Sequence, residues 1–182
     1  MWFQMVSGVL DVLAGLVAGT CLLRFAMQWQ RISFQQPLGR FVFAMTDWLV
    51  LPLRKVIPTG LAWDGSSLLG AWLIKLVQYL LLWWLAGGRG ELGLLPLVSL
   101  VGLAQLAVSA LSALVLVLAV LSWVNPGSPV YGLVGRLSEP WLRPFRRWIP
   151  EMGGVDLSPL ALLLVLQVLG VLLANLQMSW MY

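Results

Sequence analysis

Histidine does not occur among the 182 residues of the chain, and cysteine occurs once, at Cys21. Without imidazole, the chain lacks the side chain most used for acid and base catalysis, for haem ligation and for zinc binding. A lone cysteine cannot form a disulfide within its own chain, so it indicates no redox compartment. These absences exclude many enzyme classes and predict a protein without a resident metal or cofactor.

Charged residues are also scarce: they make up 10% of the chain, whereas 60% is hydrophobic. A helix that crosses the bilayer needs about 20 apolar residues. We expect the first apolar segment to be retained rather than cleaved as a secretory signal, because no basic residue precedes it and Asp11 interrupts it. The chain is therefore predicted to be an all-α membrane protein with four transmembrane helices, at residues 5–28, 67–86, 97–123 and 159–178.

Two proline-rich, basic stretches resemble each other at a distance of ninety-two residues, at residues 46–67 and 138–159. Each precedes a predicted span. The order of segments indicates two tandem repeats, residues 1–92 and 93–182, each made of a helix, an interfacial amphipathic helix and a second helix. Because each repeat contains two spans, the repeats have the same orientation and are parallel.

The amphipathic helices are predicted at residues 38–51 and 130–143. In the first, Phe41, Val42 and Trp48 recur at helical spacing, with Arg40 and Asp47 opposite them. An ordinary soluble helix would need a domain to pack on, and the loops are too short to build one. We expect each amphipathic helix to end at a proline, at Pro52 and at Pro144, because the ring removes a hydrogen-bond donor.

Positive charge is concentrated on one side of the predicted spans. Eight of the eleven lysines and arginines lie at residues 29–66 and 124–157. The positive-inside rule then places these loops in the cytoplasm and both termini on the opposite side of the membrane. Anionic lipid headgroups explain the basic loops more simply than nucleic acid does.

Two basic pairs between prolines form the predicted interaction surface, with the acidic residues near them. Such a pair could bind lipid phosphate, a carboxylate of the same chain or an acidic patch on a partner, or it could remain a solvated charge cluster. Asp156 precedes Ser158 and Pro159, which predict a helix start, so capping alone would explain it. The candidate surface contains Glu139, Arg143, Arg146, Arg147 and Asp156, with Arg54, Lys55 and Asp64 in the first repeat.

The candidate intramembrane polar residues within the predicted spans are Asp11, Arg24, Lys75, Gln78, Gln105 and Gln167. A charge at the bilayer centre costs about 2.5–3.5 kcal/mol on insertion scales. Arg24 lies near the cytoplasmic end of its span, from which its head can reach the interface. Lys75 could either pair with Asp11 or extend toward the cytoplasmic surface.

The sequence SEPWLRPFRRWIP, Ser138 to Pro150, followed by GGVDLSP and preceded by Ser122 and Trp123, resembles the YggT family of small bacterial and plastid membrane proteins. The match covers nearly the whole second repeat. The first repeat departs from the pattern, since Asp47-Trp48 replaces Glu-Pro and Lys55 replaces the second arginine. Arg24 matches a basic residue common in the family's first helix, whereas Leu118 takes that place in the second repeat.

The resemblance implies a role in membrane assembly or osmotic adaptation, because plastid relatives are linked to haem attachment and bacterial ones to cell division, osmotic tolerance and potassium uptake. It implies no catalytic residue. Two hypotheses follow. The first is a non-enzymatic scaffold or assembly factor that recruits a membrane-protein partner through its basic segments. The second is a homo-oligomeric ion or osmolyte conduit lined by the intramembrane polar residues.

Overall fold

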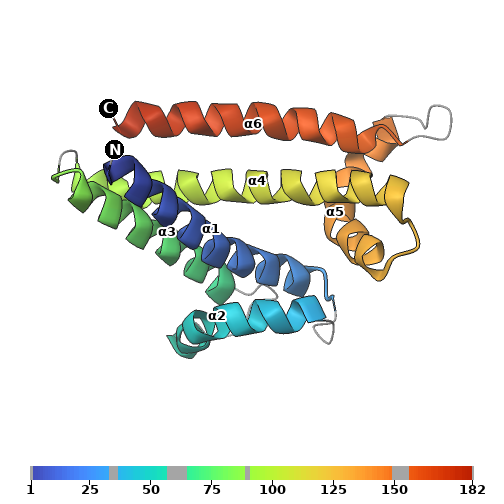
Figure 1. The fold of residues 1–182 in the computed structure, drawn as a ribbon, viewed down its shortest axis with the longest axis horizontal. Helices are drawn as coiled ribbons and strands as arrows, with labels where there is room; N and C mark the ends of the chain where they lie inside the picture. Colours follow the sequence, from blue (N-terminus) through green and yellow to red (C-terminus); the bar gives the residue numbers. More distant parts are fainter. Residues whose placement is uncertain (1, 33–36, 57–64, 89–90, 149–155, 182) are drawn as a thin grey trace. The chain divides into compact units, whose positions relative to one another are not determined.

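The computed structural model describes residues 2–32, 37–56, 65–88, 91–148 and 156–181, and almost all of them are helical (Figure 1). Four helices are long and apolar enough to cross a membrane, over Gln4–Trp29, Gly65–Leu85, Leu92–Val124 and Ser158–Ser179. This confirms the predicted all-α class and the four spans. In chain order the helices are α1 (Trp2–Trp29), α2 (Pro37–Val56), α3 (Gly65–Leu85), α4 (Leu95–Val124), α5 (Pro129–Trp148) and α6 (Ser158–Met181), with a 3₁₀ turn, η1 (Leu92–Leu94), before α4.

The order of a span, a shorter helix and a span therefore occurs twice, as a tandem repeat requires. In space the chain divides into two compact units, which cut across α4 and α6. The first unit is Met1–Leu106 with Asn175–Tyr182, and the second is Ala107–Ala174. Each has a hydrophobic core of its own.

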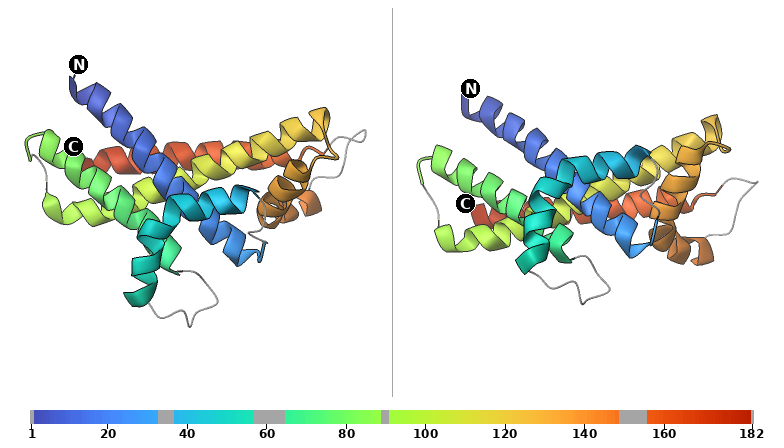
Figure 2. Two further views of the ribbon diagram at one scale, coloured as in Figure 1. Left: turned by 60° about the horizontal axis from the view of Figure 1, so that its bottom comes forward. Right: turned by 90° about the horizontal axis from the view of Figure 1, so that it is seen from below.

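In the first unit, α1 packs along α3, and α2 contacts both of these helices (Figure 2). The core contains Ala18 and Cys21 of α1, Val50 of α2 and Ala71 of α3. Gly70 allows α2 to approach α3 closely, because a Cβ added there would lie 3.3 Å from the Cδ2 atom of Leu49. Small residues at such crossings let membrane helices approach.

In the second unit, three helices contribute two buried residues each to one core. They are Val115 and Leu118 of α4, Val134 and Leu142 of α5, and Leu162 and Leu166 of α6. The apolar side of α5 is therefore buried against the ends of two spans, as expected for an amphipathic helix that connects them.

The prediction that the amphipathic helices end at a proline is wrong. Pro52 lies inside α2, and Pro140 and Pro144 lie inside α5, so both helices extend five residues beyond the predicted ends at 51 and 143. A proline within a helix removes one backbone hydrogen bond and bends the helix. Figure 2 shows that α2 and α5 each change direction along their length. Packing against the spans stabilises the helical path that proline alone disfavours.

Candidate functional site

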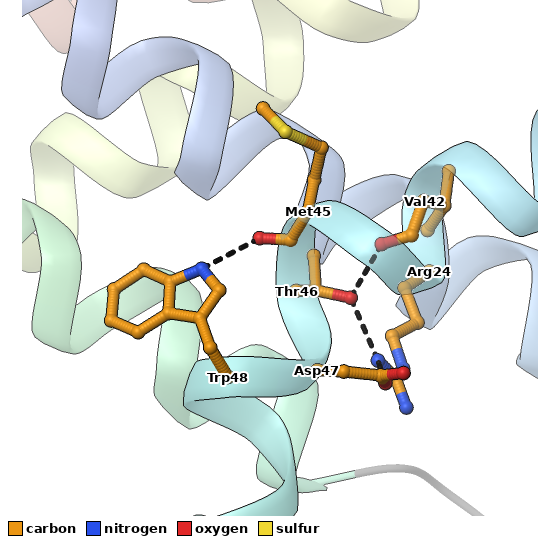
Figure 3. A network of polar contacts seen from close by, with 6 residues as sticks. All are labelled: Arg24, Val42, Met45, Thr46, Asp47 and Trp48. Carbon is orange, nitrogen blue, oxygen red and sulfur yellow. Dashed lines mark hydrogen bonds and ion pairs between the residues drawn. The ribbon is translucent and has the colours of Figure 1, made fainter.

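One buried charge of the first repeat is Arg24, near the end of α1. Its side chain is 1% exposed, and its Nη1 atom donates to the Oγ1 atom of Thr46 and to the Oδ1 atom of Asp47, each at 2.7 Å. Thr46 in turn donates to the carbonyl oxygen of Val42 at 2.6 Å (Figure 3). The guanidinium carbon also lies 4.4 Å from the centre of the Phe43 ring. Arg24 therefore fastens α2 to a spanning helix.

The sequence predicts that the Arg24 side chain reaches the interface, but it does not identify Thr46 and Asp47 as its partners. Thr46 and Asp47 come one after the other on α2, so one guanidinium can engage a hydroxyl on the buried side of the helix and a carboxylate at its edge. Asp47 keeps 41% of its side chain exposed. The signal was present in the sequence, because Thr46-Asp47 occupies the place of Ser138-Glu139 in the repeat.

The second repeat has its ion pairs on the surface. The Nη1 atom of Arg146 lies 2.9 Å from Glu139 Oε2, and its Nε atom lies 2.9 Å from Asp156 Oδ2. The other carboxylate oxygen of Asp156 accepts a hydrogen bond from the backbone N–H of Ser158, the first residue of α6. The Asp156 carboxylate therefore caps the backbone at the start of α6.

The charge state of Asp156 follows from these contacts. Partial burial acts to raise the pKa of its carboxyl group, but hydrogen bonds from Ser158 and from the Arg146 guanidinium outweigh that effect and hold the pKa below its ordinary value. At neutral pH the carboxylate is therefore ionised and joins the end of α5 to the start of α6. Three of the predicted surface residues, Glu139, Arg146 and Asp156, bind one another.

Two other predicted residues, Arg143 and Arg147, remain exposed on α5, and so does Arg136, which was not among the predicted site residues. Within the described ranges, no carboxylate forms an ion pair with any of these three arginines. Their spacing of seven and four residues places them on one side of a helix with 3.6 residues per turn. We call Arg136, Arg143 and Arg147 the arginine row.

The first repeat presents its basic pair differently. Arg54 is half-buried and Lys55 is exposed at the end of α2. Asp64 lies outside the described residues. The positions that match the arginine row are Ala44, Leu51 and Lys55, so only one of the three carries positive charge.

The intramembrane polar residues meet in part. The Nζ atom of Lys75 donates to Gln78 Oε1 at 2.9 Å, and Gln78 Nε2 donates to Asp11 Oδ1 of α1. Lys75 and Gln78 are buried, whereas Asp11 is exposed on α1. The proposed direct pair of Lys75 and Asp11 therefore has Gln78 between its members.

A second polar contact of α3 involves Tyr79, one turn after Lys75. The Tyr79 hydroxyl accepts a hydrogen bond from Gln177 Nε2 at 2.7 Å, and a Cβ added at Gly102 would lie 2.5 Å from the Tyr79 hydroxyl oxygen. Neither Tyr79 nor Gln177 was predicted, because no local pattern pairs two residues on different spans. Gln105 is half-buried on α4, and Gln167 belongs to the second unit and is exposed.

The chemistry available to these groups is ionic and hydrogen-bonding. No group of three or more His, Cys, Asp or Glu side chains that could hold a metal occurs among the residues described. The clusters hold helices together and leave a row of guanidinium groups facing outward.

Fold and clusters together define a multi-span helical membrane protein made of two repeats. The sequence profile of the CCB3/YggT family matches residues 3–85 and 97–177, one segment for each repeat, and the chain belongs to this family. No solved structure shows significant similarity to the chain.

Relatives support the assignment over most of the chain. The uncharacterized protein YggT of Escherichia coli (strain K12) is 36% identical over 158 residues, which cover 81% of this chain and 78% of the relative. The uncharacterized protein PA0392 of Pseudomonas aeruginosa is 37% identical over 171 residues, covering 92% and 87%. An uncharacterized protein in the proC 3′ region of Vibrio alginolyticus is 31% identical over 165 residues, covering 88% and 89%.

Proposed function

We propose that this protein is a non-enzymatic scaffold or assembly factor of the bacterial inner membrane, and that the arginine row of α5 binds its partner. The observation that carries the proposal is that the arginines of α5 differ in their ion pairs. All four arginines are exposed, but Arg146 binds Glu139 and Asp156 of its own chain, whereas Arg136, Arg143 and Arg147 form no ion pair with a described residue. Planar guanidinium groups bind carboxylates and phosphates in pairs of hydrogen bonds. The partner is therefore an acidic segment of a membrane protein, with anionic headgroups as neighbours.

The proposal includes an orientation. The loops that contain α2 and α5 hold most of the positive charge, so they face the cytoplasm and both termini face the periplasm. On that side, the arginine row is available to cytoplasmic tails of other inner-membrane proteins.

The test is co-purification from native membranes in a mild, lipid-retaining detergent. Arg143→Glu with Arg147→Glu reverses two members of the row and leaves the Arg146 ion pairs in place. The control, Arg40→Glu with Lys55→Glu, reverses two exposed charges of α2. Mass spectrometry is expected to find a partner in the wild type and the control that is lost with the α5 variant. Equal recovery from all three would overturn the proposal.

The second candidate function is an ion or osmolyte conduit formed by a homo-oligomer. The observation that favours it is the buried Lys75 with its contacts to Gln78 and, through Gln78, to Asp11. Ionisable groups in spanning segments mark transport pathways in many membrane proteins. Purified protein in liposomes would then give solute flux that Lys75→Met abolishes. Flux equal to that of empty liposomes would remove this candidate.

A further inference from the structure

Helix α2 has two apolar sides, one buried and one exposed. The sequence pattern alone suggests a single apolar face. Val42, Thr46 and Val50 are fully buried against the rest of the first unit. Phe41, Trp48 and Leu51 are 55%, 61% and 52% exposed, and Ala44 and Pro52 beside them are exposed as well. We call these five residues, Phe41, Ala44, Trp48, Leu51 and Pro52, the outward row. Figure 3 shows the Trp48 ring directed away from Arg24 and Asp47.

Three of the four charged residues of α2 occupy a narrow strip between its two apolar sides, and the fourth, Lys55, lies at the end of the outward side. Arg40, Asp47 and Arg54 recur every seven residues, which aligns them along the helix. Because this strip is the part of α2 suited to water, the outward row points sideways from the first unit rather than into the aqueous phase. Trp48 satisfies its indole N–H internally, by donating to the carbonyl oxygen of Met45 at 2.8 Å.

The contacts of α2 with α1 and α3 indicate how far it lies from the ends of these two spans. On α1 its ion-pair partner is Arg24, five residues before the helix end at Trp29, and on α3 it packs on Gly70, five residues after the start at Gly65. At 1.5 Å per residue, both points lie about 8 Å from the ends of the spans. An interfacial helix buries its apolar side about 5–10 Å into the boundary between headgroups and acyl chains. The outward row is therefore at the depth of that boundary.

We propose that the outward row is a lipid-binding surface, with its aromatic and aliphatic side chains among the acyl chains and with Arg40 and Lys55 on lipid phosphates. These two cations flank the row, one at each end. A second copy of the chain is the other apolar partner to consider. Two α2 helices paired through this row would bring cation against cation in either orientation, whereas anionic headgroups bind both ends. The inference concerns α2 and does not depend on the proposed role of α5.

The test compares matched positions of the two repeats with nitroxide labels. Cysteines replace Ala44, Trp48 and Leu51, and also Arg136 and Arg143, which correspond to Ala44 and Leu51. The background is Cys21→Ser; if that protein does not fold, the wild type serves, because Cys21 is fully buried. The protein is placed in bilayer nanodiscs of phosphatidylethanolamine and phosphatidylglycerol. Collision rates with oxygen, which concentrates among acyl chains, and with a water-soluble nickel chelate are then measured.

We expect oxygen to exceed the nickel chelate at all three α2 positions, and the reverse at both α5 positions. Replacing phosphatidylglycerol with phosphatidylcholine should shift the α2 labels toward the aqueous phase, because the anionic partners of Arg40 and Lys55 are removed. A higher nickel rate at the α2 positions would mean that the row faces water and would overturn the inference. Low rates for both agents, with dipolar broadening between labels, would identify a second copy as the occupant and overturn it too.

Discussion

The two repeats place the same pair of residue types at the same position of their interfacial helices and stabilise them differently. In the first, Thr46 and Asp47 are both bound by Arg24 of the spanning helix. In the second, Glu139 is bound by Arg146 of its own helix, and the Oγ atom of Ser138 is buried without a hydrogen bond to any described residue. Leu118, which stands where Arg24 would be, packs in the core instead.

A duplicated sequence pattern is therefore stabilised by different contacts in the two repeats. Arg24 joins α2 to α1 through a buried cation, so the first repeat is held internally. In the second repeat the ion pairs lie on the surface, and the basic residues next to them are free of such internal contacts within the described part of the chain. The outward-facing sides differ accordingly: α2 presents the apolar outward row and α5 presents the arginine row.

The largest expected difference in the free energy of unfolding is between Asp47→Asn and Glu139→Gln. Removing the Asp47 charge leaves the buried guanidinium of Arg24 without its counter-ion, which should lower the free energy of unfolding by about 2–3 kcal/mol. Glu139→Gln breaks an exposed pair and should cost less than about 1 kcal/mol. Unfolding in mixed micelles with increasing SDS measures both. Equal losses would contradict the distinction between a buried and a surface ion pair.

The next largest difference in stability is expected between alanine substitutions at two glycines of the spans, Gly8 of α1 and Gly102 of α4. A Cβ at Gly102 would lie 2.5 Å from the Tyr79 hydroxyl oxygen, whereas nothing lies within 4 Å of one at Gly8. Gly102→Ala should therefore cost about 1–3 kcal/mol by overpacking. Gly8→Ala should be neutral or slightly stabilising. The same unfolding assay decides, and a neutral Gly102→Ala would show that Tyr79 does not need this glycine.

A smaller effect is expected from Lys75, whose counterpart in the second repeat is Gln167. A hydrogen bond between polar side chains in a membrane protein contributes on average about 0.6 kcal/mol. Lys75→Met should therefore cost about 1 kcal/mol, and its cost should fall when Asp11→Asn is already present, since the two act through Gln78. Gln167→Met, at an exposed site, is expected to be neutral. Additive costs for Lys75 and Asp11 would refute the chain of contacts.

The smallest effect depends on pH. The pKa of Asp156 is lowered in the folded protein, so its stabilising contribution is complete above its unfolded pKa of about 3.9 and is lost as the pH falls through the folded value. Because Asp156 is only partly buried and its partner Arg146 is exposed, the effect should stay below about 0.5 kcal/mol. Comparing unfolding of the wild type and Asp156→Asn between pH 6 and pH 3, we expect the difference to shrink toward the acidic end. A difference that grows on acidification would contradict the sign of the shift.

The sequence predicted the fold class and the four spans, because long apolar runs and proline-rich loops are local signals. It could not predict that α2 and α5 continue through Pro52 and Pro144, since packing on the spans outweighs the local preference of proline. Helical spacing placed Phe41, Val42 and Trp48 on one apolar face. Only the positions of α1 and α3 show that Val42 is buried and Phe41 and Trp48 are exposed.

The predicted interaction surface was assembled from charge alone. The structure divides it into residues that bind one another, such as Arg146 and Asp156, and residues without an ion pair to a described residue, such as Arg143 and Arg147. Which arginine meets which carboxylate depends on where the start of α6 lies relative to the end of α5, and a motif does not contain that information. The Tyr79 to Gln177 contact joins residues ninety-eight positions apart, so no periodicity indicates it.

The outward sides of α2 and α5 can be compared in a native membrane by the access of water to matched positions of the two repeats. Leu51→Cys and Arg143→Cys are compared, in inverted membrane vesicles, for reaction with a membrane-impermeant maleimide. The account predicts that Arg143→Cys reacts rapidly from the cytoplasmic side, and that Leu51→Cys reacts only after the lipid is dissolved with detergent. Equal reaction at the two positions would contradict the division of roles between the repeats.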